Sequence, residues 1–316
     1  MGAGKRTDSF RPGYLKLQET GELSRRIAAL WAKLESCDIC PHRCKVNRLE
    51  DEKGKCKTGR NAVLSSFGPH FGEESPLVGR NGSGTIFFTH CNLLCIFCQN
   101  YDISHLGQGH QVDQENIAQI MLSLQNMGCH NINFVTPTHV VPQIVKALPL
   151  AIEQGLNVPL VYNSGGYDSL ATLELLEGIF DIYMPDLKYS DDKIGQSYCN
   201  AKDYASKVRE AIKEMHRQVG DLIIDERGIA LRGLLIRHLI LPEDLAGTED
   251  SMRFIAEEIS KNTYVNIMDQ YRPCYKANDH PPLDRGITRE EFSRAVKIAQ
   301  DLGLERLDGL RSLRFP

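Results

Sequence analysis

The chain has 316 residues, of which 41% are hydrophobic and 25% are charged, so it is long enough for one large α/β domain or two average ones. Its net charge of -4 does not support a generic nucleic-acid binder, because that class is usually clearly basic. The polar N-terminus shows no secretory signal, and no apolar run approaches the roughly 18 to 20 residues of a membrane-spanning helix, so we expect a cytoplasmic protein without a membrane partner.

The first predicted elements are an extended arm and a helix. Residues 1–19 are polar and contain Pro12 and Gly13, which predicts the arm. Apolar residues recur on one helical face from residue 20 to residue 34, so we predict a helix there with Thr20 as its N-cap. Residues 1–35 are therefore an N-terminal arm and helix.

Four of the ten cysteines follow within twenty residues and form the N-terminal cysteine group: Cys37, Cys40, Cys44 and Cys56. Their spacing fits zinc or an iron–sulfur cluster equally, and free thiols without a metal are the alternative. We expect His42, which lies among them, to be a solvated loop residue. Seven Lys and Arg against three acidic residues between Arg43 and Arg60 would stabilise bound thiolates, unless they form a patch for an acidic partner.

The segment that follows, residues 61–83, contains glycines and prolines that predict turns rather than a regular element. We expect His70, Glu73 and Glu74 to be solvated loop residues, and contact with a substrate is the alternative. Residues 36–83 are therefore a cysteine-rich metal-binding module and a loop.

A second group, the cysteine triad, follows a predicted strand. Residues 84–90 are mainly apolar, β-branched or aromatic, and Cys91, Cys95 and Cys98 come next with C-x3-C-x2-C spacing. Three thiolates can bind three corners of one [4Fe–4S] cluster and leave its fourth iron without a protein ligand. An open position lets a metal bind and activate a small molecule, whereas a zinc knuckle is the alternative.

Strands and helices alternate after the triad, which implies right-handed βαβ units and a parallel sheet. In that architecture the site lies at the carboxyl ends of the strands. The predicted strands are 132–135, 158–162, 181–184, 234–241 and 264–268, with a hairpin of 222–224 and 229–231. The predicted helices are 113–127, 140–154, 169–177, 201–219, 248–260 and one that begins near residue 288.

The triad, with Phe97 just before its third cysteine, resembles the signature of the radical S-adenosylmethionine (SAM) superfamily. The run Met184-Pro185-Asp186-Leu187-Lys188 resembles the strand-four motif of pyruvate formate-lyase activating enzyme and its relatives. The N-terminal cysteine group and residues 88–92 resemble an uncharacterised X-type branch of these relatives. The resemblance implies a partial (βα)6 TIM-like barrel, with the radical SAM core at residues 84–245 and a C-terminal α/β extension at 246–316 that completes the barrel.

The resemblance also implies roles at the methionine end of SAM. The triad would bind the [4Fe–4S] cluster, whose open iron would chelate the amino and carboxylate groups of SAM. Thr136 and Thr138 stand where many relatives carry a Gly-Gly-Glu motif, so their hydroxyls or backbone carbonyls are the candidates for the amino group. The Met184 carbonyl and Asp186, with Lys188 in the same motif, would hold the carboxylate through a possible monovalent cation.

Other strand-end residues would face the rest of SAM or the substrate. Phe97 would pack near the adenine, and Asn163 and Ser164 would contact the ribose or the sulfonium. Arg237 and His238 would lie near the nucleoside or the substrate. The alternative for each polar residue is a helix cap or a backbone contact, which strand-end polar residues often make.

The implied function is reductive SAM cleavage by an oxidoreductase, which gives a 5′-deoxyadenosyl radical and requires no general base. The radical would activate a glycyl radical enzyme or modify another protein or peptide. A small molecule or RNA is the alternative substrate, and a non-catalytic zinc-binding interaction protein is the alternative class. The implied partners are SAM and an electron donor such as flavodoxin or ferredoxin, in an anaerobic or well-reduced cytoplasm. We expect Cys129, Cys199 and Cys274 to be buried thiols, with a substrate-facing Cys274 as the alternative.

Overall fold

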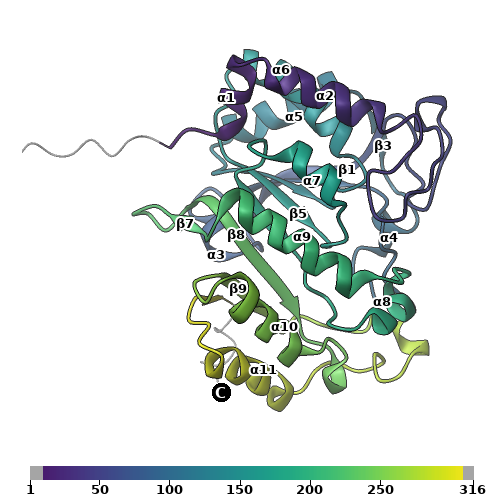
Figure 1. The fold of residues 1–316 in the computed structure, drawn as a ribbon, viewed down its shortest axis with the longest axis vertical. Helices are drawn as coiled ribbons and strands as arrows, with labels where there is room; N and C mark the ends of the chain where they lie inside the picture. Colours follow the sequence, from purple (N-terminus) through teal and green to yellow (C-terminus); the bar gives the residue numbers. More distant parts are fainter. Residues whose placement is uncertain (1–9, 309–316) are drawn as a thin grey trace, which may run out of the picture.

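The computed structural model describes residues 10–308, and Figure 1 shows a curved sheet flanked by helices. Strand order is β10-β9-β8-β6-β5-β4-β2-β1-β3, and β7 pairs with β8 outside this path. Strands β2 through β10 along this path are parallel, whereas β1 and β3 are antiparallel additions. The predicted α/β class, a mostly parallel sheet in a partial barrel, is confirmed.

The parallel strands begin close to the predicted positions. They are β2 (Ser83–Phe88), β4 (Ile132–Val135), β5 (Leu160–Ser164), β6 (Ile182–Pro185), β8 (Ala230–Leu239), β9 (Tyr264–Met268) and β10 (Leu307–Asp308). The predicted hairpin is confirmed, because β7 (Ile223–Ile224) pairs antiparallel with β8. The two strands predicted over 229–231 and 234–241 are one continuous strand, since Gly233 at φ 126° continues the chain without a break.

The main helices also agree with their predictions. They are α5 (Gln114–Asn126), α6 (Val141–Glu153), α7 (Leu170–Leu176), α9 (Tyr204–Val219), α10 (Thr248–Phe254) and α11 (Arg289–Asp301), and a π-helical turn (Ile255–Ile259) extends α10. The capping box predicted for the last helix is present, between Thr288 and Glu291. Short helices α4 (Tyr101–Ser104) and α8 (Asp192–Cys199) were not predicted. No helix within residues 10–308 combines the length and apolarity needed to cross a membrane.

The N-terminal prediction is wrong from residue 13 on, and its residues 1–9 lie outside the part of the chain that the structure describes. Residues predicted as an arm form α1 (Gly13–Glu19), and α2 (Glu22–Ala32) follows Gly21, so Thr20 caps the end of α1 instead of starting a helix. Tertiary contacts fix α1: the Gly13 amide donates to Asp181 Oδ1 at 2.9 Å, and the buried Tyr14 donates to Val158 O at 2.9 Å. Long-range anchoring of this kind leaves no local sequence signal.

Residues 61–83 are regular, contrary to the prediction. They form β1 (Ala62–His70), which pairs antiparallel with β2 from Leu64↔Phe88 to His70↔Ser83, and α3 (Ser75–Val78). The pairing of β1 with β3 (His110–Val112) covers only 62–64, so the rest of β1 is an open edge. Pro69 is tolerated there because an edge strand can lack an N–H.

An apolar plug fills one end of the barrel interior. Leu77 of α3 packs with Val161, Ile182, Met184 and Leu235, which point inward from β5, β6 and β8. A larger core lies between the sheet and its outer helices. Polar side chains follow the plug along the same inward faces, so the interior changes from apolar to polar toward the carboxyl ends of the strands.

Candidate active site

The triad lies in the loop after β2, at the carboxyl end of the sheet. Its three thiols are free and half-buried. Two of them already accept or share hydrogen bonds: the Leu93 amide donates to Cys91 Sγ at 3.3 Å, and Cys98 Sγ lies 3.2 Å from Ser104 Oγ. Burial, followed by the nearby charge of Cys95, raises the pKa of both Cys91 and Cys98.

Asp186 is the centre of a charged network at the ends of β5, β6 and β8. Its Oδ1 accepts from Arg237 Nε at 2.7 Å, and its Oδ2 accepts from Lys188 Nζ at 2.5 Å. Arg237 Nη2 donates to Asn163 Oδ1 at 2.7 Å. Burial alone would raise the pKa of Asp186, but the charges of Arg237 and Lys188 outweigh it and hold that pKa below its usual value.

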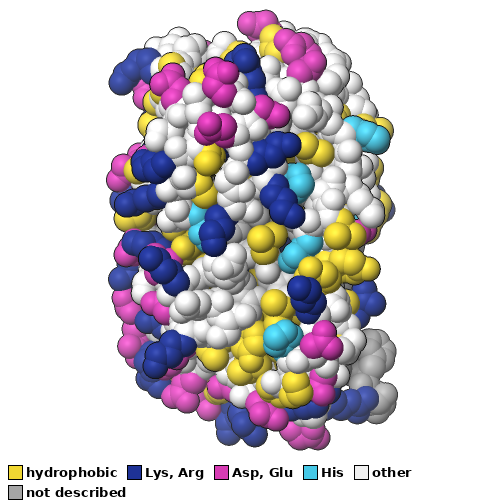
Figure 2. All heavy atoms as spheres, turned by 90° about the vertical axis from the view of Figure 1, so that its right-hand side faces the viewer, with side chains coloured by type: hydrophobic (Ala, Val, Ile, Leu, Met, Phe, Trp, Pro, Cys, Tyr) yellow, Lys and Arg dark blue, Asp and Glu magenta, His cyan; other side chains and the backbone are white. Residues whose placement is uncertain are grey.

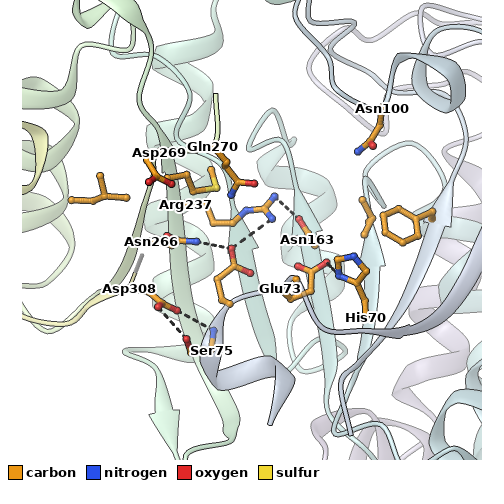
Figure 3. A pocket seen from close by; sticks show the side chains of 16 residues that line it. His70, Glu73, Ser75, Asn100, Asn163, Arg237, Asn266, Asp269, Gln270 and Asp308 are labelled. Carbon is orange, nitrogen blue, oxygen red and sulfur yellow. Dashed lines mark hydrogen bonds and ion pairs between the residues drawn. The ribbon is translucent and has the colours of Figure 1, made fainter. Parts of the chain in front are cut away.

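A cavity of about 440 Å³ connects this network with the triad loop (Figure 3). Asn100, two residues after the last cysteine of the triad, lines one end. Glu73 and Glu74 also line this cavity, so their prediction as solvated loop residues is wrong. Only 8% and 4% of their side-chain surfaces are exposed, because the segment between β1 and α3 turns into the barrel.

Thr138 and Ser164, which were predicted to contact SAM, instead hydrogen-bond to the buried carboxylate of Asp168. The sequence reasoning missed this carboxylate. Thr138 Oγ1 and Ser164 Oγ each donate to Asp168 at 2.7 Å, and Tyr162 donates to it at 2.8 Å. Thr136 adopts a left-handed φ of 55°, and its amide donates to Asn163 O. The network fixes the strand-end loops and leaves the Thr138 and Ser164 hydroxyls engaged.

The remaining predicted residues separate into two sets. Asn163 and Arg237 line the cavity, and Asp186 and Lys188 join them through hydrogen bonds. His238 is fully buried, where its ring contacts Leu187 O at 2.7 Å and Thr248 Oγ1 at 3.1 Å. Since successive residues of a strand alternate in direction, it points away from Arg237.

Phe97 and Met184 both lie in apolar surroundings. Phe97 is buried edge-to-face against Tyr271, with 5.6 Å between ring centroids. The Met184 side chain belongs to the apolar plug, which leaves its backbone as the part near Asp186. Cys199 is buried as expected, and its proximity to Cys95 raises the pKa of its own thiol.

The four thiols of the N-terminal cysteine group line one small cavity together with Arg48 and His139. Arg48 is 1% exposed; its Nε donates to Gly59 O, its Nη1 lies 4.0 Å from Cys37 Sγ, and its Nη2 has no partner within residues 10–308. His139 contacts Thr89 O at 2.9 Å, and burial lowers its pKa to about 3, so its ring is neutral. Among the described residues, no three or more His, Cys, Asp or Glu are grouped so that they could hold a metal ion.

The N-terminal cysteine group packs directly on the triad loop. His42 Nε2 lies 2.7 Å from Asn92 O, beside Cys91, and its ring meets Tyr167 edge-on. His42 is half-buried and its ring is engaged by these contacts, so its prediction as a solvated residue is wrong. Burial also lowers its pKa. The two cysteine sites are therefore neighbours in space. The sequence does not reveal this, because 35 residues separate Cys56 from Cys91.

Comparison with known proteins identifies the family. Residues 85–225 match the Radical SAM superfamily. The chain is 35% identical over 280 residues to the uncharacterized protein MJ0674 of Methanocaldococcus jannaschii, which covers 86% of this chain and 76% of that protein. Among solved structures, HydG, a maturase of the [FeFe]-hydrogenase, aligns with a TM-score of 0.46 and 10% identity, over 69% of this chain and 48% of that one. This chain belongs to the radical SAM superfamily, whose members use a [4Fe–4S] cluster and SAM for radical chemistry.

Proposed function

We propose that Cys91, Cys95 and Cys98 hold the [4Fe–4S] cluster of a SAM-cleaving enzyme. The observation that carries this proposal is the position of three free thiols in the one loop that follows β2, next to Asn100 of the polar cavity at the carboxyl ends of the strands. The Leu93 amide and the Ser104 hydroxyl contact two of the sulfurs, and the charge of Lys188 partly offsets the rise in pKa that burial causes at Cys91, so these groups would help to stabilise metal-bound thiolates.

The chain's own residues would orient SAM in this cavity. When bound, the cluster and SAM supply a 5′-deoxyadenosyl radical that takes a hydrogen atom from the substrate. Asn163, Asp186 and Arg237 are linked by hydrogen bonds across adjacent strands, so they form a preorganised polar wall. Asp186 already binds two protein cations, which favours direct contact of the SAM carboxylate with Lys188 or Arg237 over a separate monovalent cation.

We propose a second, anionic metal–thiolate centre at the N-terminal cysteine group. A buried guanidinium needs a nearby anion, and the thiols are what Arg48 faces. Arg48→Met should lower the metal content of this site, while Lys53→Met, an exposed cation in the same loop, should not. Iron, zinc and sulfide analysis identifies the centre; a sulfide-containing cluster beside the triad loop supports electron relay, and zinc supports a structural role.

The surface around this centre suits an acidic electron donor such as a flavodoxin or a ferredoxin. Lys45, Lys53, Lys55 and Lys57 are exposed there. Figure 2 shows Lys and Arg side chains with histidines and apolar side chains between them on the face where residues 40–60 lie. Opposite charge steers such a partner to its docking surface, so reduction by the donor should slow as salt rises.

The catalytic barrel in this proposal begins before the triad strand. Because β1 extends the sheet and Leu77 of α3 packs into the barrel interior, residues 62–82 belong with the core at 84–245, and the cysteine module ends near residue 61. Residues 246–308 add β9, β10 and their helices. The Met184–Lys188 motif supports activation of a glycyl radical enzyme or modification of another peptide. A small-molecule substrate is the second candidate, because the cavity is of a size that encloses one.

The test is anaerobic reconstitution of the full chain with iron and sulfide, followed by reduction in the presence of SAM. We expect four irons at the triad and formation of 5′-deoxyadenosine, and Cys95→Ala should abolish that product. Cys129→Ala, which changes a buried cysteine beside Gly84 away from the triad, is the matched control. Zinc at both cysteine groups without sulfide would refute the proposal in favour of a non-catalytic zinc protein.

A further inference from the structure

Two carboxylates enter the barrel through its open seam. The sheet does not close between the free edge of β1 and β10, and the chain after β1 crosses this gap. Ser75 ties the crossing in place, because its amide and hydroxyl donate to the two carboxylate oxygens of Asp308 at 3.0 and 3.1 Å. Glu73 and Glu74, immediately before Ser75, thereby line the cavity. Figure 3 shows Glu73 beside His70.

The acid pair has unused hydrogen-bonding capacity. Glu74 Oε1 accepts from Asn266 Nδ2 at 3.1 Å, but its Oε2 is buried without a partner among residues 10–308. The Glu73 Oε1 atom lies 3.4 Å from His70 Nδ1. Asn133 is completely buried near Glu73 and favours its charged form, yet neither atom of its amide reaches hydrogen-bond geometry. Buried polar atoms without partners are rare, so these atoms indicate a missing ligand.

Charge at this end of the cavity is also unbalanced. Arg237 is the one Lys or Arg among the described residues that line the cavity. It is engaged mainly by Asp186 and Asn163, at 2.7 Å each, and its Nη1 lies 3.8 Å from Glu74 Oε1. Burial raises the pKa of both Glu73 and Glu74 in spite of that cation. A second cation beside the pair would restore the balance.

We propose that Glu73 and Glu74 form the substrate subsite of this enzyme and bind a cationic group, an ammonium or a guanidinium, on an alkyl chain. The subsite rests on the proposed function and names the substrate class for it. The cation takes the free Glu74 Oε2 and the neighbouring Asn133 amide as further acceptors. Phe87, Val135 and Met268 in the cavity wall suit the alkyl chain, and the end of the cavity at Asn100 remains for SAM.

The first experiment measures binding of small probes to the anaerobically reconstituted full chain with SAM present. We expect n-butylguanidine or n-butylamine to bind at least about tenfold more tightly than n-butanol, which has a similar alkyl chain without the charge. Glu73→Gln and Glu74→Gln should each weaken the cationic probe about tenfold or more, while the charge-conserving Glu73→Asp should retain most of the affinity. Glu249→Gln, on an exposed helix face, is the matched control and should behave like wild type.

The outcomes separate this inference from the proposed function. If wild type binds n-butanol as tightly as the cationic probes, the proposed cation subsite is refuted. This comparison needs no variant, so it does not depend on whether a variant folds. Loss of SAM affinity by the same factor as probe affinity would assign the acids to SAM and would also overturn it. Absence of 5′-deoxyadenosine from wild type would instead refute the proposed function, because probe binding is scored separately.

A second experiment distinguishes a free cation from a cationic side chain. Deuterated agmatine and a peptide with a deuterated arginine are each incubated with the reduced enzyme and SAM. Deuterium in 5′-deoxyadenosine from either compound supports the subsite and shows which source carries the cation. Transfer from a deuterated anionic analogue, N-acetylglutamate, in preference to both would overturn it.

Discussion

Arg237→Met should destabilise the folded chain because it removes the cation shared by three buried partners. The arginine contacts Asp186 and Asn163 at 2.7 Å and Glu74 at 3.8 Å, and only 18% of its side chain is exposed. Breaking a buried charge pair by removing one partner costs about 3 to 5 kcal/mol, since the other charge stays buried. The same change at Arg253, whose side chain is 47% exposed, should cost about 0 to 1 kcal/mol.

The stability that Arg237→Met removes should increase as the pH rises. Burial raises the pKa of Glu73 and Glu74 and Arg237 opposes that rise, so the substitution raises both pKa values further. A carboxyl with a raised folded pKa contributes stability that is present below its unfolded pKa and lost as the pH rises through the folded pKa. Asp186, with its lowered pKa, contributes stability at higher pH that depends on Arg237. Both effects make the deficit larger at about pH 8 than at about pH 5.

Urea unfolding of reconstituted wild type, Arg237→Met and Arg253→Met, followed by circular dichroism at both pH values, measures this difference. Equal slopes against urea allow the midpoints to be compared as stabilities. An Arg237→Met deficit below about 1 kcal/mol, or one that does not shrink at the lower pH, would refute the assignment of this arginine as the counter-ion of the buried acids.

Three further substitutions test other parts of the fold by the same assay. The pKa of Asp181 is raised to about 7, mainly by burial, so wild type should lose stability as the pH rises toward that value, and Asp181→Asn should show a weaker pH dependence. Thr288→Ala removes the capping box with Glu291 and should cost about 1 kcal/mol, which Thr288→Ser should restore. Gly233→Ala places a Cβ 2.4 Å from the nearest backbone atom at φ 126° and should cost about 2 to 4 kcal/mol, more than Gly220→Ala, which meets nothing within 4 Å.

The parallel sheet was predictable because its signals are local. Each strand from β4 to β6 is a short apolar run followed by polar residues, and the helices between them carry a helical period of apolar residues. The triad needs only the spacing of its cysteines after such a run. Residues Asn163, Asp186 and Arg237 were predictable as neighbours because the ends of parallel strands meet at one edge of the sheet.

Burial produced by long-range contacts was not predictable in this way. Gly68 and Pro69 indicate turns, yet antiparallel pairing with β2 makes them part of a strand. Glu73 and Glu74 have the composition of a solvated loop, and only the crossing of the open seam places them in the barrel. Arg48 is one of seven cations in its segment, and no local pattern distinguishes the buried one from its exposed neighbours. Asp168 offered a weak signal, since a carboxylate after Gly165 and Gly166 can turn back to the strand end.

The site of the N-terminal cysteine group and the site of the Glu73–Glu74 pair have opposite charge imbalances. The same physical rule interprets both. Arg48 is a buried cation that faces thiols instead of a carboxylate, so the group that completes its site must carry negative charge, as metal-bound thiolates do. Glu74 is a buried anion with a free oxygen and a cation that is mostly engaged elsewhere, so the group that completes its site must carry positive charge. Because a buried charge is stable only when it is matched, each imbalance gives the sign of what binds there. The substrate inference therefore rests on the same rule as the second metal centre, applied to a buried anion instead of a buried cation.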